Sequence, residues 1–336
     1  MSLKIAINGF GRIGRGMARI LFKENLDLEL MAVNSRSNAE DLAYLLKYDS
    51  VHGVFPGQVD FEYDKLIVNG RRIILPRMDA LPEELPWRDL GVQLVLESTG
   101  AFRDGPSVSG HIRAGAKKVI IAAPGKDIDA TFVYGVNHQS YDPARHHVVS
   151  NASCTTNCLA PLVKVLHETF GIEHGLMTTA HSYTMSQRIL DGSHKKDMRR
   201  GRAAGVSIVP TSTGAATAVG EVLPELQGHL DGVALRIPTP DVSITDFTAL
   251  VKNSTSKEEI NQTFTRAAQG ELQGILAVSQ KPLSVDYTGS YYSAIVDASL
   301  THVMQGTMVK VMAWYDNEMG FAHRMLDLAA YIGARL

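Results

Sequence analysis

The stretch "KIAINGFGRIGRG", residues 4–16, decides the fold of the first half of the chain. Its apolar start, Lys4–Asn8, predicts a strand that runs directly into a G-x-G-x-x-G pattern made by Gly9, Gly11 and Gly14. Such glycines permit a tight strand-to-helix turn and close approach of the backbone to a pyrophosphate at the helix N-terminus. Glycine-rich turns also serve packing alone, but this one follows the first strand of an alternating β and α region. We therefore expect a dinucleotide-binding turn.

Short β-rich runs alternate with helical patterns through the first half of the chain. The expected strands are Lys4–Asn8, Leu28–Asn34, Val92–Ser98, Lys118–Ala122, Thr131–Val136 and His147–Ser150. Expected helices include Ile13–Phe22 and Glu40–Leu46, with Ser37 and Glu40 as a capping box for the second. This alternation predicts an α/β domain with a parallel sheet and right-handed crossovers.

The pattern changes after about Asn151. A long helix is expected from Ser153, with an apolar face and with Pro161 kinking it or delaying its regular start. Longer alternating runs then predict a mostly antiparallel sheet in an α+β domain; they are Leu176–His181, Gly232–Pro238, Val242–Val251 and Thr307–Trp314. The apolar helical face in residues 320–334 indicates a last helix. We expect a dinucleotide-binding domain over residues 1–153, a second domain over 154–318, and a C-terminal helix, 319–336, that packs back on the first domain.

Composition excludes several classes of function. The chain has 336 residues, 45% of them apolar and 20% charged, with a net charge of -2. This balance gives no electrostatic reason to expect nucleic acid or anionic lipid as partners, and no apolar run is long enough to span a membrane. A strand begins almost at the first residue, so no signal peptide is expected. The two cysteines, four residues apart, form a poor zinc or disulfide framework and suit a reducing cytoplasm, so we expect no metal.

One cysteine and one histidine stand out. Cys154, in "SNASCTTNC" (150–158), lies at the start of the expected long helix, where backbone N–H groups and the helix dipole stabilise a thiolate. A small buried cysteine is the plainer interpretation, and it fits Cys158 better because polar residues surround Cys154. His181 ends an alternating strand, and a histidine near a thiolate can act as a general base. The sequence alone does not bring the two side chains together.

Eight motifs, in order and spread over nearly the whole chain, resemble the phosphorylating glyceraldehyde-3-phosphate dehydrogenases. They are "NGFGRIGR", "LLKYDSVHG", "SNASCTTNCLAP", "HSYT…QRILD", "RRGRAA", "PTSTGAA", "LRIPTPDVS" and "WYDNEMGF". The resemblance implies a Rossmann-type dinucleotide-binding domain, a catalytic domain that begins at the cysteine, and a homotetramer. It also implies oxidation of D-glyceraldehyde 3-phosphate, with inorganic phosphate and NAD(P)+, to 1,3-bisphosphoglycerate through a cysteine thioester.

The resemblance assigns roles residue by residue. Cys154 is the nucleophile and His181 the base. The substrate phosphate and the attacking inorganic phosphate are bound by Ser153, Thr155, Thr184, Arg200, Thr213, Gly214 and Arg236, and two anions do require arginines and backbone donors. The cofactor-binding residues are Gly9, Gly11, Arg12, Ile13, Gly14, Asn34, Ser35, Arg36, Thr99, Ser193 and Asn317. Of these, Asn317 fixes the nicotinamide carboxamide.

The chain departs from the family pattern at three places. Met185 and Ser186 stand where Asn-Asp is common, Phe321 where tyrosine is often found, and Ala122 where a serine often contacts the adenosine side. The nearest alternative activity is that of erythrose-4-phosphate dehydrogenase, on the same scaffold. A non-catalytic nucleotide-binding scaffold is the alternative from another class. Both the nucleophile and the base are present, which favours the enzyme.

The end of the second expected strand, "NSRS" (34–37), predicts the coenzyme. An acid usually binds the adenosine ribose hydroxyls there and repels a 2′-phosphate; this chain has Ser35 in its place, followed by Arg36. Gly192 and Ser193 stand where NAD-specific relatives typically carry Leu-Pro and NADP-using photosynthetic relatives a small residue and a serine. The resemblance implies that the charged loop around them, residues 183–204, crosses a subunit interface. We expect NADP to be preferred, or both coenzymes to be used.

Overall fold

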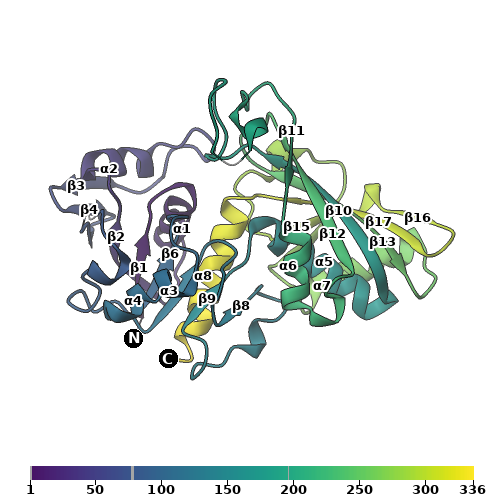
Figure 1. Cartoon of the computed structure of the whole chain (residues 1–336), viewed down its shortest axis with the longest axis horizontal. Coiled ribbons are helices and arrows are strands. Elements are labelled where there is room, and N and C mark those ends of the chain that lie inside the picture. Colours follow the sequence, from purple (N-terminus) through teal and green to yellow (C-terminus); the bar gives the residue numbers. More distant parts are fainter. Residues whose placement is uncertain (1, 77–78, 196) are drawn as a thin grey trace. The chain divides into compact units, whose positions relative to one another are not determined.

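The computed structural model describes residues 2–76, 79–195 and 197–336 (Figure 1). The chain divides into two compact units. Unit 1 contains the described residues up to Tyr134 together with His138–Ser153 and Ala322–Leu336; unit 2 contains Gly135–Asn137 and Cys154–Phe321.

Unit 1 is built on a nine-stranded sheet with the order β3-β4-β5-β2-β1-β6-β7-β9-β8. The strands are β1 Leu3–Asn8, β2 Leu28–Asn34, β3 Val59–Glu62, β4 Lys65–Val68, β5 Arg71–Ile74, β6 Leu94–Glu97, β7 Lys118–Ile121, β8 Ala130–Thr131 and β9 Val148–Ser150. Pairing is parallel from β5 through β8, and only β3, β4 and β5 form an antiparallel meander at one edge. The central strands β1, β6 and β7 are almost wholly buried, as expected of parallel strands covered on both faces.

Helices surround this sheet. They are α1 Arg12–Lys23, α2 Ala39–Lys47, the short α3 Gly105–Val108 and α4 Gly110–Arg113, and most of α8 Met319–Gly333, with 3-10 turns at Pro82–Glu84 and His138–Ser140. In α8, a Cβ built on Gly333 would lie 2.7 Å from Leu3 Cδ2. The C-terminal helix therefore packs closely against β1 within unit 1.

Two local expectations for unit 1 are wrong. The N-cap of α2 is Asn38, whose side chain accepts a hydrogen bond from Asp41 N at 2.8 Å, so Ser37 and Glu40 form no capping box. Asparagine is among the strongest N-cap residues, and it displaces the serine one position earlier. The strand expected at Thr131–Val136 is only the two residues of β8. The apolar side chains of Phe132 and Val133 are buried, so their hydrophobicity comes from the core rather than from sheet pairing.

Unit 2 is an eight-stranded, mostly antiparallel sheet with helices. The strands are β10 Ile172–Ser182, β11 Val209–Ser212, β12 Leu230–Ile237, β13 Ser243–Val251, β14 Leu276–Ser279, β15 Ala294–Asp297, β16 His302–Met304 and β17 Met308–Tyr315. Their order is β11-β12-β10-β13-β17-β15-β14, with β16 paired to β17. Only β10 with β12 and β14 with β15 pair in parallel. Residues along β13 and β17 alternate between buried and partly exposed, which confirms the expected half-buried antiparallel strands.

The helices of unit 2 are α5 Cys154–Phe170, α6 Ala215–Val222 and α7 Lys257–Gln269, with 3-10 turns at Met198–Gly201, Pro224–Leu226, Ser284–Tyr287 and Ala298–Leu300. The long helix α5 runs without interruption through Pro161, so the expected delay of its regular start is wrong. Its residues from Thr155 to Val163 are all buried, and this packing outweighs the one hydrogen bond that proline cannot make. Helices α6 and α7 were not expected from the sequence pattern.

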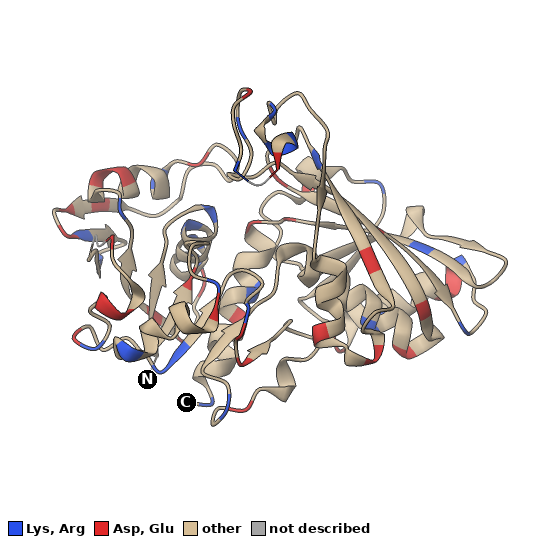
Figure 2. Ribbon diagram, viewed as in Figure 1, with Lys and Arg blue, Asp and Glu red and all other residues tan. Residues whose placement is uncertain are grey.

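Acidic and basic residues are interspersed along the ribbon of both units (Figure 2). Among the described residues, none of the helices combines the length and the apolar character that crossing a bilayer requires.

Candidate active site

Cys154 and His181 meet in unit 2. Cys154 is the first residue of α5, and its Sγ lies 3.4 Å from Nε2 of His181, near the end of β10. Ala152, two residues before Cys154, has a φ of 56°, a left-handed conformation that is uncommon for a residue with a Cβ. The strained turn and the helix start thus present the thiol to the imidazole, which sequence alone could not show.

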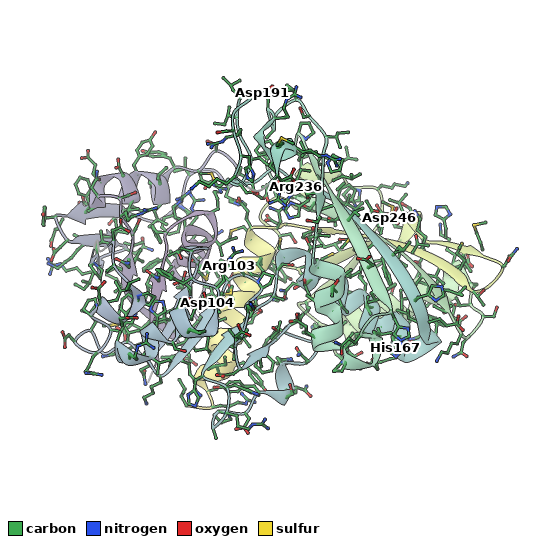
Figure 3. The ribbon with its side chains drawn as sticks, in the orientation of Figure 1. Arg103, Asp104, His167, Asp191, Arg236 and Asp246 are labelled. Atoms are coloured by element: carbon green, nitrogen blue, oxygen red, sulfur yellow. The ribbon has the colours of Figure 1, made fainter. Side chains whose placement is uncertain are left out.

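Arg236 stands beside this pair. The parallel register of β10 and β12 places His181 opposite Arg236, and Figure 3 labels Arg236. Nδ1 of His181 lies 2.7 Å from Ser182 O and 2.7 Å from Nη1 of Arg236. A carbonyl only accepts and a guanidinium only donates, so the two contacts belong to different imidazole tautomers. Only the tautomer that donates from Nδ1 to Ser182 O leaves the lone pair of Nε2 facing Sγ.

Burial dominates the titration of both groups. Burial, together with the charge of Arg236, lowers the pKa of His181 to about 3. Burial raises the pKa of the Cys154 thiol, while Arg236 and hydrogen bonds from Thr155 oppose that rise. Arg236 and the hydrogen bonds at the helix start therefore lower the pKa of the Cys154 thiol, as expected. Desolvation raises that pKa by more, so the net shift is upward.

A buried tyrosine anchors the start of α5 to the sheet. The hydroxyl of Tyr315, at the end of β17, lies 2.9 Å from Oγ1 of Thr155 and 2.9 Å from Oγ1 of Thr179 on β10. The Tyr315 ring also contacts the His181 ring edge-on, with centroids 6.0 Å apart. One side chain thus ties together the elements that carry the thiol and the imidazole. The sequence analysis missed Tyr315 and Thr179, although Tyr315 lies inside the motif "WYDNEMGF".

The other residues expected to bind phosphate lie on separate segments of unit 2, except Ser153, which is assigned to unit 1. Gly214 is the N-cap of α6, where Thr213 Oγ1 accepts from Ala215 N at 3.2 Å. Thr156 donates from Oγ1 to Ala215 O, which joins the first turns of α5 and α6. Arg200 lies in the 3-10 turn of the long loop, and its charge acts on Arg236. Ser153 directly precedes Cys154 in the chain.

The loop from Tyr183 to Ala204 folds back on itself, and the structure describes all of it except Lys196. Gly192 N donates to Gly201 O at 2.8 Å, and Arg188 donates to Ser193 O at 3.1 Å. Thr184 Oγ1 lies 3.0 Å from Oγ of Ser186, so the serine at this departure from the family pattern contacts an expected phosphate ligand. The side chain of Met185 is 91% exposed.

The glycine-rich turn of unit 1 fits a dinucleotide. Gly9 has a φ of 96°, and a Cβ there would lie 2.5 Å from Thr99 N; a Cβ on Gly14 would lie 2.2 Å from Gly9 O. Gly11, the N-cap of α1, faces open space. The turn therefore needs glycine for its conformation and close packing, and the first N–H groups of α1, from Arg12 and Ile13, suit a pyrophosphate.

Polar residues also end β2, the strand that pairs with β1. Asn34, at the end of β2, is buried, while Ser35 is half-buried and Arg36 exposed. Arg36 approaches Asp79 only at 3.8 Å, with both side chains about 80% exposed, which makes a weak pair. Arg12 is bound to Asp49, with Nη2 to Oδ1 at 3.1 Å.

Asn317 follows β17 in unit 2, and its Oδ1 accepts a hydrogen bond from Ser243 Oγ at 2.7 Å. The N–H groups of this amide are therefore its donors toward any other partner. The adjacent Val242 has a φ of 62°, a genuine outlier for a β-branched residue and a further strained position in this unit. Phe321 is buried.

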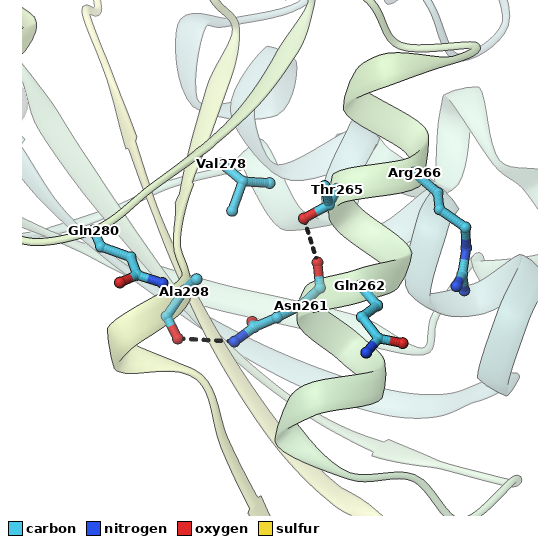
Figure 4. Close-up of a pocket in the computed structure, with 7 residues that line it drawn as sticks. All are labelled: Asn261, Gln262, Thr265, Arg266, Val278, Gln280 and Ala298. Atoms are coloured by element: carbon cyan, nitrogen blue, oxygen red, sulfur yellow. Dashed lines mark hydrogen bonds between the residues drawn. The ribbon is translucent and has the colours of Figure 1, made fainter.

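A separate shallow pocket of about 390 Å³ lies between α7 and β14 (Figure 4). Its central amide, Asn261, donates to Ala298 O at 2.9 Å and accepts from Thr301 Oγ1 at 2.7 Å. The side chains that line it are Asn261, Gln262, Thr265, Arg266, Val278, Gln280 and Ala298, which include no nucleophile or general base. It is not the reaction site.

A dinucleotide-binding sheet in one unit and a thiol–imidazole–guanidinium group in the other are features of a nicotinamide-dependent dehydrogenase. Comparison with known proteins gives the family. Residues 3–105 match the glyceraldehyde 3-phosphate dehydrogenase NAD binding domain, and residues 153–317 match the C-terminal domain of the same enzymes. The chain belongs to the glyceraldehyde-3-phosphate dehydrogenase family.

Named relatives agree over their full lengths. The chain is 55% identical, over all its residues, to a glyceraldehyde-3-phosphate dehydrogenase of Geobacillus stearothermophilus, of which it covers 99%. It is 54% identical to glyceraldehyde-3-phosphate dehydrogenase 2 of Trichormus variabilis, with 99% of each chain covered. It is 52% identical to glyceraldehyde-3-phosphate dehydrogenase 1 of Bacillus cereus, again over 99% of each chain. The family and these relatives support phosphorylating glyceraldehyde-3-phosphate dehydrogenase activity with a nicotinamide dinucleotide, as the resemblance implied.

Proposed function

We propose that Cys154 is the nucleophile and His181 the general base of the phosphorylating oxidation of D-glyceraldehyde 3-phosphate. The observation that carries this proposal is the 3.4 Å contact of Sγ with Nε2 at the start of α5, with Arg236 alongside. A nucleophile and base within reach of one another, with the base held by a third group, is the arrangement that covalent catalysis requires.

Sγ of Cys154 bonds to the aldehyde carbon, and its proton passes to the aldehyde oxygen, which becomes a hydroxyl. A bound nicotinamide supplies the acceptor for the hydride that this carbon then loses. His181 accepts the hydroxyl proton at Nε2 as the carbonyl re-forms, which leaves a thioester on Sγ. Inorganic phosphate attacks the thioester carbon, the S–C bond breaks, and Cys154 returns as a thiolate while 1,3-bisphosphoglycerate leaves.

Anion binding and base function are linked at Arg236. We infer that Thr184, Arg200 and Arg236 bind the substrate phosphate, and that Ser153, Thr155, Thr213, Gly214 and Arg236 surround inorganic phosphate. An anion bound by Arg236 takes up guanidinium hydrogen bonds that otherwise reach Nδ1 of His181. This favours the tautomer that donates to Ser182 O and leaves Nε2 as the base.

Cys154→Ser tests the central role, and Cys158→Ser is its matched control one turn later in α5. We expect Cys154→Ser to lose aldehyde oxidation but to keep dinucleotide binding, because an alcohol of ordinary pKa is a far poorer nucleophile. Cys158, buried with its Sγ 3.9 Å from Ala313 O, should tolerate the change. Activity that survives in Cys154→Ser, or disappears only in Cys158→Ser, would contradict the assignment.

The two alternatives have separate tests. Turnover of erythrose 4-phosphate faster than that of glyceraldehyde 3-phosphate would indicate the sister activity, which the names of the relatives do not favour. Absence of any turnover with an intact Cys154 thiol would indicate a nucleotide-binding scaffold.

We further propose that NADP is preferred, or that both coenzymes are used. Support comes from the end of β2, where Ser35 carries no charge to repel a 2′-phosphate and the exposed Arg36 has only a weak partner. Asn317 would hold the nicotinamide carboxamide, and Ser193 of a neighbouring subunit would reach the 2′-phosphate. A charge-assisted contact of ~1.5–3 kcal/mol corresponds to a preference of roughly ten- to a hundredfold.

Catalytic efficiency with each coenzyme tests this preference. Ser35→Asp should shift the ratio toward NAD, whereas Ser37→Asp adds the same charge at an exposed position two residues later and should shift it less. A wild type that favours NAD, or a Ser35→Asp variant with an unchanged ratio, would overturn the proposal.

We also infer a homotetramer held partly by the loop of residues 183–204. This loop and the segment after it expose large apolar side chains, a feature typical of interaction surfaces; the exposed residues are Met185, Ile189, Leu190, Met198, Val206 and Ile208. Light scattering at micromolar concentration should give four times the chain mass, and a monomer would refute the inference. Both cysteines are free thiols, which agrees with a reducing cytoplasm as the proposed location.

A further inference from the structure

A chain of buried polar side chains crosses unit 1 where β1, β2 and β6 end. Its centre is Glu97, the last residue of β6, which is 1% exposed. Asn8 and Asn34 extend it across the ends of β1 and β2, and His111 and Trp87 extend it in the other direction. The sequence analysis missed Glu97, although an acid at the end of an apolar strand is visible in "LVLEST" (94–99).

Four donors converge on the two carboxylate oxygens of Glu97. Asn8 Nδ2 donates to Oε2 at 2.6 Å, and His111 Nε2 lies 3.0 Å from the same oxygen. The backbone N–H of Thr99 donates to Oε1 at 2.8 Å, and so does the Thr99 hydroxyl. An ionised carboxylate accepts at both oxygens and has nothing to donate, so it satisfies all four groups, whereas an amide would not.

Trp87 fixes the role of His111 in this chain. Indole Nε1 is only a donor, and it lies 2.9 Å from Nδ1 of His111. Nδ1 must therefore be the acceptor, and the ring proton sits on Nε2, where it is donated to Glu97. His111 is thus a neutral donor, and the carboxylate is held by hydrogen bonds rather than by a positive charge.

The other end of the chain reaches the nucleotide-binding edge. Because Asn8 donates to Glu97, its Oδ1 faces the opposite way and accepts from Asn34 Nδ2 at 2.9 Å. Asn34 directly precedes Ser35, the position at which an acid usually binds the ribose, and one of its two amide N–H groups is committed to Asn8. Glu97 also accepts a hydrogen bond from the backbone N–H of Thr99. Gly9 of the glycine-rich turn packs closely against that same backbone.

We propose that Glu97 is a positioning residue for the dinucleotide: through Asn8 it orients the Asn34 amide toward the adenosine ribose, and through Thr99 it holds the glycine-rich turn. The buried acid on β6 thereby fixes the amide next to the position of the usual acid on β2. This inference rests on the cofactor-binding role that the family resemblance implies for Asn34, and it is independent of the chemistry proposed for Cys154.

Isothermal titration of Glu97→Gln with NADP, NAD and ADP-ribose tests the proposal. We expect Kd to rise roughly ten- to a hundredfold for all three ligands, because an amide turns at least one attractive contact into a clash of donors. ADP-ribose lacks the nicotinamide, so an equal loss for it locates the effect at the adenosine half. Glu83→Gln, which changes an exposed acid of the same unit bonded to Arg113, should leave Kd unchanged. An unchanged or lower Kd in folded Glu97→Gln would overturn the proposal.

Two further measurements separate positioning from a general loss of structure. In an Asn34→Ala background, Glu97→Gln should weaken ADP-ribose binding less than it does alone; full additivity of the two effects would overturn the route through Asn34. Trp87→Phe keeps an aromatic side chain but removes the donor to His111 together with part of the buried ring, and it should raise Kd roughly fivefold. If Glu97→Gln fails to fold, Trp87→Phe becomes the test. An unchanged Kd in Trp87→Phe would then contradict the role of the hydrogen-bonded chain through His111. In Glu97→Gln without nucleotide, the rate at which Cys154 is alkylated should stay at the wild-type value. Failure of the proposed catalytic roles would appear in Cys154→Ser instead.

Discussion

Replacing His181 with asparagine should raise the apparent pKa of the Cys154 thiol. Burial lowers the pKa of His181 to about 3 and raises that of Cys154, so neither group alone is charged at neutral pH. Proton transfer from Sγ to Nε2 creates a thiolate and an imidazolium whose separation is the present 3.4 Å contact. Their attraction is worth about 5 kcal/mol at an effective dielectric constant of roughly 20. Protonating an imidazole whose pKa is about 3 costs about 5 kcal/mol at pH 7, which is as large as that attraction.

The pH dependence of alkylation measures this balance. Under the proposed thiol–imidazole pairing, the wild-type thiolate forms with the help of His181, so the rate of alkylation should begin to rise at a lower pH than for a thiol without that partner. In His181→Asn no proton acceptor is left, and the rise should move to higher pH by at least about one unit, a loss of about tenfold at pH 7. Aldehyde oxidation should fall by about a hundredfold or more, the usual range for a lost general base.

The control is His174→Asn, an exposed histidine on the same strand, β10, which should change neither rate. Identical alkylation profiles for the wild type and His181→Asn would refute the proposed thiol–imidazole pair. So would a profile that moves to lower pH.

Two other substitutions test the scaffold. Gly9→Ala places a Cβ 2.5 Å from Thr99 N at a φ of 96°, so the free energy of unfolding in urea should fall by more than about 1 kcal/mol, while Gly11→Ala, with open space around its Cβ, should cost less. Equal stability of the two variants would contradict the close-packed turn. Tyr315→Phe removes the hydroxyl that joins two buried threonine hydroxyls and should cost about 1–3 kcal/mol of stability and lower the oxidation rate, whereas Tyr291→Phe, near the surface, should do neither. A fully active and stable Tyr315→Phe would show that the start of α5 needs no anchor.

Much of unit 1 was predictable because its signals are local. The buried runs of β1 and β2 are continuous in the sequence, and the glycine-rich turn between β1 and α1 needs glycine for reasons of backbone conformation that the sequence displays. The meander of β3, β4 and β5 was not anticipated, because each strand is only four residues long and so short an alternation is a weak signal. The N-cap of α2 was misplaced by one residue, since Ser37 and Asn38 are both good capping residues.

The site in unit 2 was harder to predict because it depends on register between distant segments. His181 and Arg236 are neighbours only because β10 and β12 pair in parallel, within a sheet whose other pairings are mostly antiparallel. The hydrophobic pattern and the spacing do not encode that pairing. The resemblance to a family was needed to connect His181 with Arg236. Tyr315 and Glu97 were missed for the same reason, since a hydrogen-bonded partner 160 or 89 residues away leaves no local pattern.

Mass spectrometry of the acyl-enzyme tests the central claim most directly. The protein is mixed with D-glyceraldehyde 3-phosphate and NADP or NAD in the absence of inorganic phosphate, quenched in acid, and digested. We predict a 3-phosphoglyceroyl group on the peptide that contains Cys154, none on Cys154→Ser, and its loss on addition of phosphate with formation of 1,3-bisphosphoglycerate. Coenzyme reduction that proceeds with no adduct on Cys154, or an adduct that phosphate does not discharge, would contradict the account.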